Sequence, residues 1–247
     1  MTSASVGFHC PECTRSGAQQ VYRARDLEVV PRLIYILMGL SIVTFIAQGI
    51  SSGGSGFTSG EVVDRGILFG PLVREGEYWR LVTSGFLHAD LFHIGLNMYA
   101  LYLFGPAVER SVGALRMALI YLGGLLGGGA AVMLFNFTAP TLGASGAVLG
   151  LAGGLAAILW SRGIAITQTS LGALFLLNLA LPLLVPGISF WGHFGGIAGG
   201  FIVGWLVSFL PGKFGQPDGV ANGLAVVAIV ALALLGIVAA EMGGVGI

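Results

Sequence analysis

Long apolar stretches separated by polar segments dominate the chain from residue 32 onward. About 20 apolar residues in a helix are enough to cross the hydrocarbon core of a bilayer. Read with a window of about 19 residues, the pattern predicts a series of such spans. They cover residues 32–50, 87–107, 114–136, 144–161, 165–185, 190–210 and 220–240. The expected fold class is therefore an all-α polytopic membrane protein.

The polar segments predict three divisions. Residues 1–31 form a polar tail, residues 32–210 a core, and residues 211–247 a C-terminal part that contains one extra span. Within the core, residues 51–86 make a long connection that mixes charged and apolar residues. Connections of this length without regular structure are uncommon in compact domains. We therefore expect residues 51–86 to form a folded external loop, partly embedded in the membrane.

Composition supports the membrane assignment. The chain is 55% hydrophobic and only 9% charged, with a mean hydropathy of +0.91, whereas soluble domains carry about 25% charged residues. The net charge is zero, which argues against nucleic acid as a partner. The 42 glycines suit helices that pack closely in lipid, where small residues let backbones approach.

Basic residues predict the orientation, because cytoplasmic loops carry an excess of lysine and arginine. With a cytoplasmic N-terminus, the inside segments hold Arg15, Arg23, Arg25, Arg32, Arg110, Arg116, Arg162 and Lys213. The outside segments hold only Arg65, Arg74 and Arg80, all in the long loop. We expect a multi-pass protein of the inner (plasma) membrane with its N-terminus in the cytoplasm.

Cys10 and Cys13 form a C-x-x-C pair in the tail. A closed structural zinc site needs four ligands, and His9 is a poor third ligand because it is adjacent to Cys10. Two interpretations stay open: free thiols on a cytosolic tail, or part of a zinc ribbon completed by a dimer partner or by residues upstream. The core itself is expected to need no cofactor.

Rare polar residues lie near the starts of three spans that all run from outside to inside. Ser145 opens the fourth span within Gly143-Ala144-Ser145-Gly146, a pattern that is common by chance. His193 opens the sixth span, and the second contains His93 and Asn97. Polar side chains in lipid are costly and mark candidate functional sites. The topology places all of them near the external face.

Glycines spaced four apart suggest how Ser145 and His193 could meet. Gly146, Gly150 and Gly154 form one ladder, and Gly196, Gly200 and Gly204 form another. Each ladder lies on one helix face and allows close contact. If the ladders face each other, serine and histidine form a nucleophile–base pair. The alternative is that the glycines only pack helices and His193 is an interhelical hydrogen-bonding group.

His93 and Asn97 are four residues apart and share a helix face. Both could donate to an oxyanion, together with a main-chain N–H at the helix start. The alternative, a polar brace between helices, is compatible with that role. His88 lies five residues before His93, and we expect it to point toward the membrane interface.

These residues together resemble the rhomboid intramembrane serine proteases. The matching residues are Trp79-Arg80, His88, His93-x-x-x-Asn97, Glu109-Arg110, Gly143-x-Ser145-Gly146 and His193-x-x-Gly196-x-x-x-Gly200. They occur in the family's order over residues 32–210. The last span resembles the extra helix of six-plus-one forms, and the Cys10/Cys13 segment resembles the end of a zinc-ribbon-like head found on some actinobacterial members.

The resemblance implies a Ser145–His193 dyad that cleaves transmembrane protein substrates, with His93 and Asn97 binding the oxyanion. It also implies structural roles for Trp79, Arg80, Glu109, Gly143, Gly146, Gly196 and Gly200. Many members carry an aromatic residue four after the serine, where this chain has Leu149. Two other functions stay open: a catalytically silent relative that binds membrane clients, and a small-solute transporter.

Overall fold

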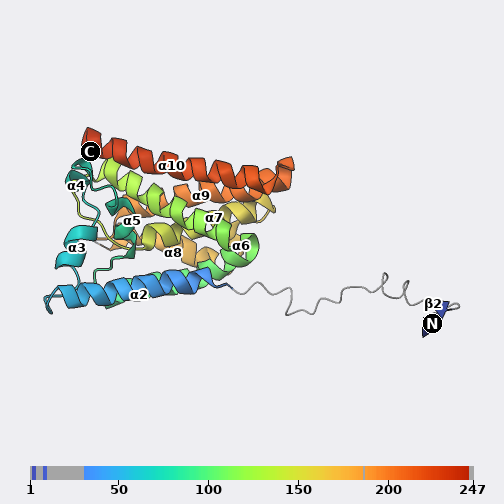
Figure 1. Cartoon of the computed structure of the whole chain (residues 1–247), viewed down its shortest axis with the longest axis horizontal. Coiled ribbons are helices and arrows are strands. Elements are labelled where there is room, and N and C mark those ends of the chain that lie inside the picture. Colours follow the sequence, from blue (N-terminus) through green and yellow to red (C-terminus); the bar gives the residue numbers. More distant parts are fainter. Residues whose placement is uncertain (1, 4–7, 10–30, 186, 245–247) are drawn as a thin grey trace. The chain divides into compact units, whose positions relative to one another are not determined.

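The computed structural model describes residues 2–3, 8–9, 31–185 and 187–244, in two compact units, Met1–Val30 and Pro31–Ile247. In the first, β1 (Thr2–Ser3) pairs antiparallel with β2 (Phe8–His9). The second is helical (Figure 1). Its helices are α2 (Leu33–Ser51), α3 (Glu61–Gly66), α4 (Gly70–Arg74), α5 (Arg80–Thr83), η2 (Ser84–Phe86), α6 (Leu91–Phe135), α7 (Ser145–Ser161), η3 (Ile166–Gln168), α8 (Gly172–Leu184), α9 (Phe190–Phe214) and α10 (Asp218–Met242).

The apolar pattern predicts the helices well, with two differences. Helices α2, α6, α9 and α10 are long and apolar enough to cross a membrane, and α7 and α8 are shorter apolar helices. The predicted spans 87–107 and 114–136 join into α6, which is interrupted where Gly113 takes a φ of 83°. The predicted span 165–185 begins as a helix only at Gly172, because residues 166–168 form the 3₁₀ turn η3. The chain is an all-α polytopic membrane protein apart from the two short strands.

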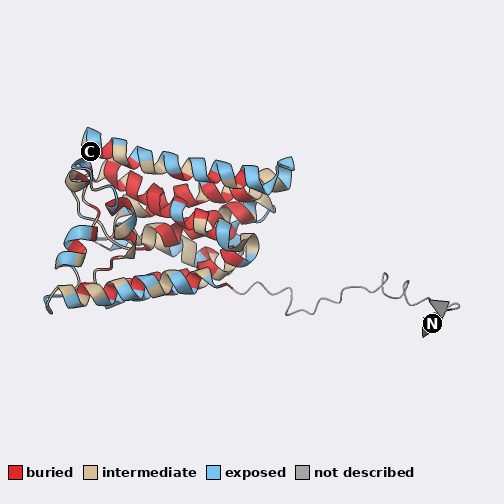
Figure 2. Cartoon of the chain, viewed as in Figure 1, coloured by how far each residue is buried: buried red, intermediate tan, exposed pale blue. Residues whose placement is uncertain are grey.

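Helices α6, α7 and α9 form the centre of the bundle. Most residues of α7 are buried, and α9 buries the face that carries its glycines. Figure 2 shows this buried centre, with exposed residues along the outer faces of α2 and α10. Those outer faces are apolar, as lipid contact requires.

Glycine-to-glycine contacts set the distance between the three central helices. A Cβ added to Gly196 would lie 2.8 Å from the Gly146 carbonyl carbon, and one on Gly204 would lie 2.6 Å from Gly154 Cα. The two ladders thus face each other with α7 and α9 parallel, as their spacing predicts. The second half of α6 packs antiparallel in the same way, because a Cβ on Gly124 would lie 2.6 Å from Gly150 Cα.

Polar caps attach the outer helices α2 and α10. Glu109, buried in α6, accepts hydrogen bonds from the backbone N–H groups of Arg32 (2.9 Å), Leu33 (3.0 Å) and Ile34 (3.4 Å) at the start of α2. These donors have no partner within the helix, and the carboxylate complements the helix dipole. At the end of α10, Arg74 Nε donates to the Ala240 carbonyl at 2.9 Å.

Candidate active site

The starts of three helices position the candidate residues. Ser145 is the first residue of α7. His93 lies in the first turn of α6, where the Asp90 side chain accepts its backbone N–H at 2.8 Å. His193 lies in the first turn of α9, whose N-cap Ser189 accepts from Gly192 N–H at 3.1 Å. Helix N-termini carry partial positive charge, which favours an anion formed beside them.

The glycine contact places Ser145 and His193 at neighbouring positions of α7 and α9. A Cβ on Gly146 would lie 3.2 Å from the Gly192 carbonyl oxygen, and these glycines directly adjoin Ser145 and His193 in the sequence. Within residues 31–185 and 187–244, no hydrogen bond joins the serine hydroxyl to the imidazole. The fold therefore brings the two residues to one place without closing the bond between them.

The surroundings of His193 suit a proton acceptor. Its side chain is only 5% exposed, and its Nδ1 lies 3.4 Å from the Asn178 carbonyl oxygen of α8. A carbonyl can only accept, so this contact favours the tautomer with the proton on Nδ1. The other nitrogen, Nε2, then keeps its lone pair.

His93 has the opposite arrangement. Its Nδ1 accepts the backbone N–H of Ala89 at 3.3 Å, which in a neutral ring leaves the proton on Nε2. The Cβ position of Gly143 lies 2.9 Å from this Nε2 and 3.8 Å from Ser145 Oγ. Gly143 has a φ of 129°, a conformation that favours glycine. A larger residue would also occupy the space between the His93 ring and the serine.

Further hydrogen-bond donors lie in the first turns. The first hydrogen bond of α7 runs from Val148 N–H to the Ala144 carbonyl. The N–H of Ser145, three residues earlier, therefore has no acceptor within the helix. Asn97 is buried, and its amide donates to the His93 carbonyl at 2.9 Å. One N–H of that amide remains for another acceptor.

His88 does not point toward the membrane interface, which corrects our expectation. Its side chain is fully buried, and its ring packs edge-on against His93 with centroids 5.2 Å apart. Among the described residues neither ring nitrogen is hydrogen-bonded. Burial lowers the pKa of His88 to about 4, with His93 acting in the same direction and the Phe86 backbone in the opposite one.

Gln48 of α2 is a structural residue that the sequence analysis missed. Its amide donates to the carbonyls of Phe57 (2.6 Å) and His88 (3.0 Å), and its oxygen accepts the His88 N–H at 3.0 Å. The signal available was a fully buried polar residue inside an apolar span. Gln48 thereby fixes the backbone just before α6.

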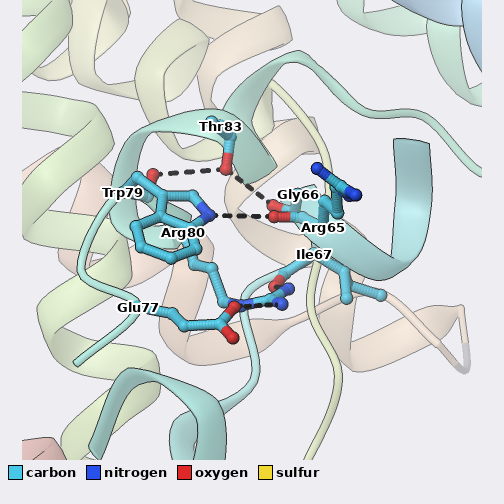
Figure 3. Close-up of polar contacts among 7 residues, drawn as sticks. All are labelled: Arg65, Gly66, Ile67, Glu77, Trp79, Arg80 and Thr83. Carbon is cyan, nitrogen blue, oxygen red and sulfur yellow. Dashed lines mark hydrogen bonds and ion pairs between the residues drawn. The ribbon is translucent and has the colours of Figure 1, made fainter. Parts of the chain in front are cut away.

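The predicted folded loop is held around Arg80 (Figure 3). Arg80 donates to the Glu77 carboxylate (2.7 Å) and to the Ile67 carbonyl (2.8 Å). Trp79 Nε1 donates to the Arg65 carbonyl at 3.0 Å. Thr83 donates to the Gly66 carbonyl at 2.9 Å.

This loop continues to the serine through main-chain bonds. Arg80 binds the carbonyl of Ile67, and the next residue, Leu68, exchanges two backbone hydrogen bonds with Thr141 at 3.0 and 2.8 Å. The N–H of Gly143 then donates to the Ser84 carbonyl at 3.0 Å. Trp79 and Arg80 are therefore connected to the segment that leads into Ser145.

The possible zinc ligands Cys10 and Cys13 lie outside the described residues. Among the residues that are described, no cluster of three or more histidine, cysteine, aspartate or glutamate side chains could hold a metal ion. The described site is built from serine, histidine, amide and main-chain groups.

The chain is similar in sequence to known proteins. The chain is 32% identical to Rhomboid protease GluP of Bacillus subtilis over 210 residues, which cover 83% of this chain and 39% of that protein. It is 36% identical to RHOMBOID-like protein 6, mitochondrial, of Arabidopsis thaliana over 145 residues, 57% of this chain and 47% of that protein. The chain thus spans less than half the length of these relatives. Residues 75–209, more than half of the chain, match the Rhomboid domain, and the chain therefore belongs to the rhomboid family.

Proposed function

We propose that this protein is an intramembrane serine endopeptidase that cleaves transmembrane segments of other membrane proteins. The observation that carries the proposal is the convergence of three helix starts: His93 and Ser145 lie beside Gly143, and Gly146 and Gly192, the neighbours of Ser145 and His193, are in contact. The name of the Bacillus relative, a rhomboid protease, supports the same reaction class.

In the proposed mechanism, Ser145 Oγ attacks the carbonyl carbon of a peptide bond while His193 Nε2 accepts the hydroxyl proton. The carbonyl oxygen becomes an oxyanion, stabilised by His93 Nε2–H, the Asn97 amide and the Ser145 main-chain N–H. His193 then gives its proton to the leaving amine, and an acyl-enzyme remains. Water hydrolyses this ester with His193 again acting as base, which restores the serine.

The hydrogen bonds of the two histidines fit these different roles. The Asn178 carbonyl favours His193 with a free Nε2 lone pair, as a base requires. The Ala89 N–H favours His93 with a proton on Nε2, as an oxyanion donor requires. The Ser145–His193 hydrogen bond is expected to form in the substrate complex, since catalytic hydrogen bonds often tighten only there.

The proposed orientation has the N-terminus in the cytoplasm of a plasma-membrane protein, with the site opening to the external face. Its water enters from that side, because lipid supplies none. A substrate helix must unwind locally before its amides become accessible, so glycine or proline near the cleaved bond should speed the reaction.

The test compares the wild-type chain with Ser145→Ala and His193→Ala, using a fluorescent transmembrane substrate in proteoliposomes. We expect cleavage by the wild type alone, with losses of several orders of magnitude in both variants. Cleavage that survives Ser145→Ala would refute the nucleophile assignment. No cleavage of varied substrates by a folded wild-type protein would favour a silent, client-binding relative.

Two further measurements test the chemistry. The rate should fall as the pH drops through the titration of His193, because a protonated imidazole cannot accept the serine proton. A rate that stays constant as the pH falls through the whole acid range in which the protein remains folded would argue against His193 as the base, if the chemical step limits the rate. A chelator such as EDTA should leave cleavage unchanged, since no step requires a metal ion.

A further inference from the structure

A cavity of about 730 Å³ lies at the end of the helices away from Ser145. It is bounded by the C-terminal ends of α7 and α9 and by the interruption of α6 near Gly113. Helix α7 separates it from Ser145 by roughly 24 Å, at 1.5 Å per residue over its length. The cavity is therefore distinct from the proposed catalytic site.

Basic side chains from each of these helices line the cavity: Arg116 of α6, Arg162 after α7, and Lys213 of α9. No aspartate or glutamate is among its described lining residues. Arg116 is paired with Asp218 at 2.6 Å and with the Asn222 amide oxygen at 3.0 Å. Among the described residues Arg162 and Lys213 have no carboxylate within ion-pair distance.

The positive charge of Arg116, Arg162 and Lys213 exceeds the negative charge that surrounds the cavity. Cations near a helix C-terminus are favourable because each end carries a partial charge of roughly −0.5. The ends of α7 and α9, together with Asp218, offset about two of the three positive charges. The remaining positive charge faces a hollow large enough for a bound group, so the cavity favours an anion.

The aromatic residues of the lining indicate that the bound anion also carries an apolar group. Trp160 and Phe209 stack with centroids 6.0 Å apart, and Lys213 Nζ lies 5.1 Å from the centroid of the Phe209 ring. Trp160 is 57% exposed. Aromatic and basic groups gather where a membrane meets water, and basic pockets between spanning helices bind lipid headgroups.

We propose that this cavity binds the phosphate group of an anionic phospholipid. Arg162 and Lys213 contact the phosphate, Arg116 adds to the positive field, and Trp160 and Phe209 lie against the upper part of an acyl chain. The lipid would link the ends of α7 and α9 on the face opposite Ser145. This binding does not depend on the protease mechanism.

The experiment measures thermal unfolding of the full chain in neutral detergent while phosphatidylglycerol, phosphatidylcholine or inorganic phosphate is added. We expect phosphatidylglycerol to raise the unfolding midpoint, with little effect of the other two. Arg162→Gln and Lys213→Gln should each weaken this binding by about tenfold, which corresponds to about 1.4 kcal/mol. Arg162→Lys should retain most of the binding.

The matched control is Arg65→Gln, which removes one positive charge from an exposed side chain whose only ion pair among the described residues is with the exposed Glu61. It should bind phosphatidylglycerol like the wild type. Midpoints without lipid show whether each variant is folded.

Equal binding by the wild type and an Arg162→Gln/Lys213→Gln double variant would overturn the proposal, as would equal shifts with phosphatidylcholine. An equal shift with inorganic phosphate would assign the cavity to a free phosphate instead of a lipid.

Discussion

Replacing Gly200 with alanine tests whether the glycine ladders hold the site together. A Cβ on Gly200 would overlap the backbone of Gly150 at its carbonyl oxygen, its carbonyl carbon and its Cα. The same change at Gly212, also in α9, meets no atom within 4 Å. The two variants thus add the same methyl group to the same helix in opposite environments.

The size of the effect follows from the atoms that the methyl group meets. Backbone atoms cannot rotate away as a side chain can, and carbon contacts need about 3.5 Å, so α7 and α9 must separate by roughly 1 Å. Overpacking costs about 1–3 kcal/mol or more, while alanine in place of a helical glycine gains up to about 1 kcal/mol. We expect Gly200→Ala to lose about 2 kcal/mol of stability and Gly212→Ala to lose none.

The displacement should also affect catalysis, because a misplacement of about 1 Å can cost roughly 100-fold in rate. The assay pairs SDS-induced unfolding in mixed micelles, followed by circular dichroism, with substrate cleavage per folded molecule. Equal stability of Gly200→Ala and Gly212→Ala would refute the claim that the ladder contact sets the helix separation. The expected stability loss in Gly200→Ala, combined with unchanged cleavage per folded molecule, would refute only the connection between the ladder contact and the proposed Ser145–His193 dyad.

Three further predictions concern the groups around the site. Glu109→Gln should lower stability by about 1–2 kcal/mol, since it removes the charge that caps α2, while the exposed Glu61→Gln should change it by less than about 0.5 kcal/mol; similar losses in both would contradict the cap. Arg80→Gln should cost about 2–3 kcal/mol by leaving the buried loop contacts incomplete, against almost no loss in Arg65→Gln, as urea unfolding would show. The free energy of unfolding should decrease as the pH falls from about 6.5 toward 4, because the pKa of His88 is about 4 in the folded protein and about 6.5 in the unfolded chain, so the unfolded chain binds the extra proton. His88→Gln should reduce the slope of stability against pH in thermal unfolding, and an unchanged slope would refute the assignment of this pH dependence to His88.

Features with a fixed helical period were predictable from the sequence. The four-residue spacing of Gly146, Gly150 and Gly154 determines a helix face without knowledge of the partner, and its contact with α9 follows from parallel spans. The interruption of α6 at Gly113 lies at the boundary between the predicted spans 87–107 and 114–136, although the helix itself continues across it. The positions of Ser145, His93 and His193 at helix starts followed from the same pattern.

Features that depend on distant contacts were not predictable in this way. The hydrogen bonds of Gln48 with His88 need the tertiary fold, and so do the carbonyl partners of Arg80. The burial of His88 contradicted an expectation based on helical spacing, because His88 precedes the N-cap Asp90 and does not follow that spacing. The proton positions inferred for His93 and His193 likewise rest on main-chain groups that no side-chain pattern reveals.

The cap formed by Glu109 has a consequence for the order of assembly. Its carboxylate binds the N–H of Arg32, which lies 77 residues earlier in the chain. During synthesis α2 is complete long before Glu109 exists, so its first N–H groups must be hydrated by the aqueous phase until α6 has entered the membrane. Docking of α2 is therefore a late step, in which water at its N-terminus is exchanged for a carboxylate from the following span.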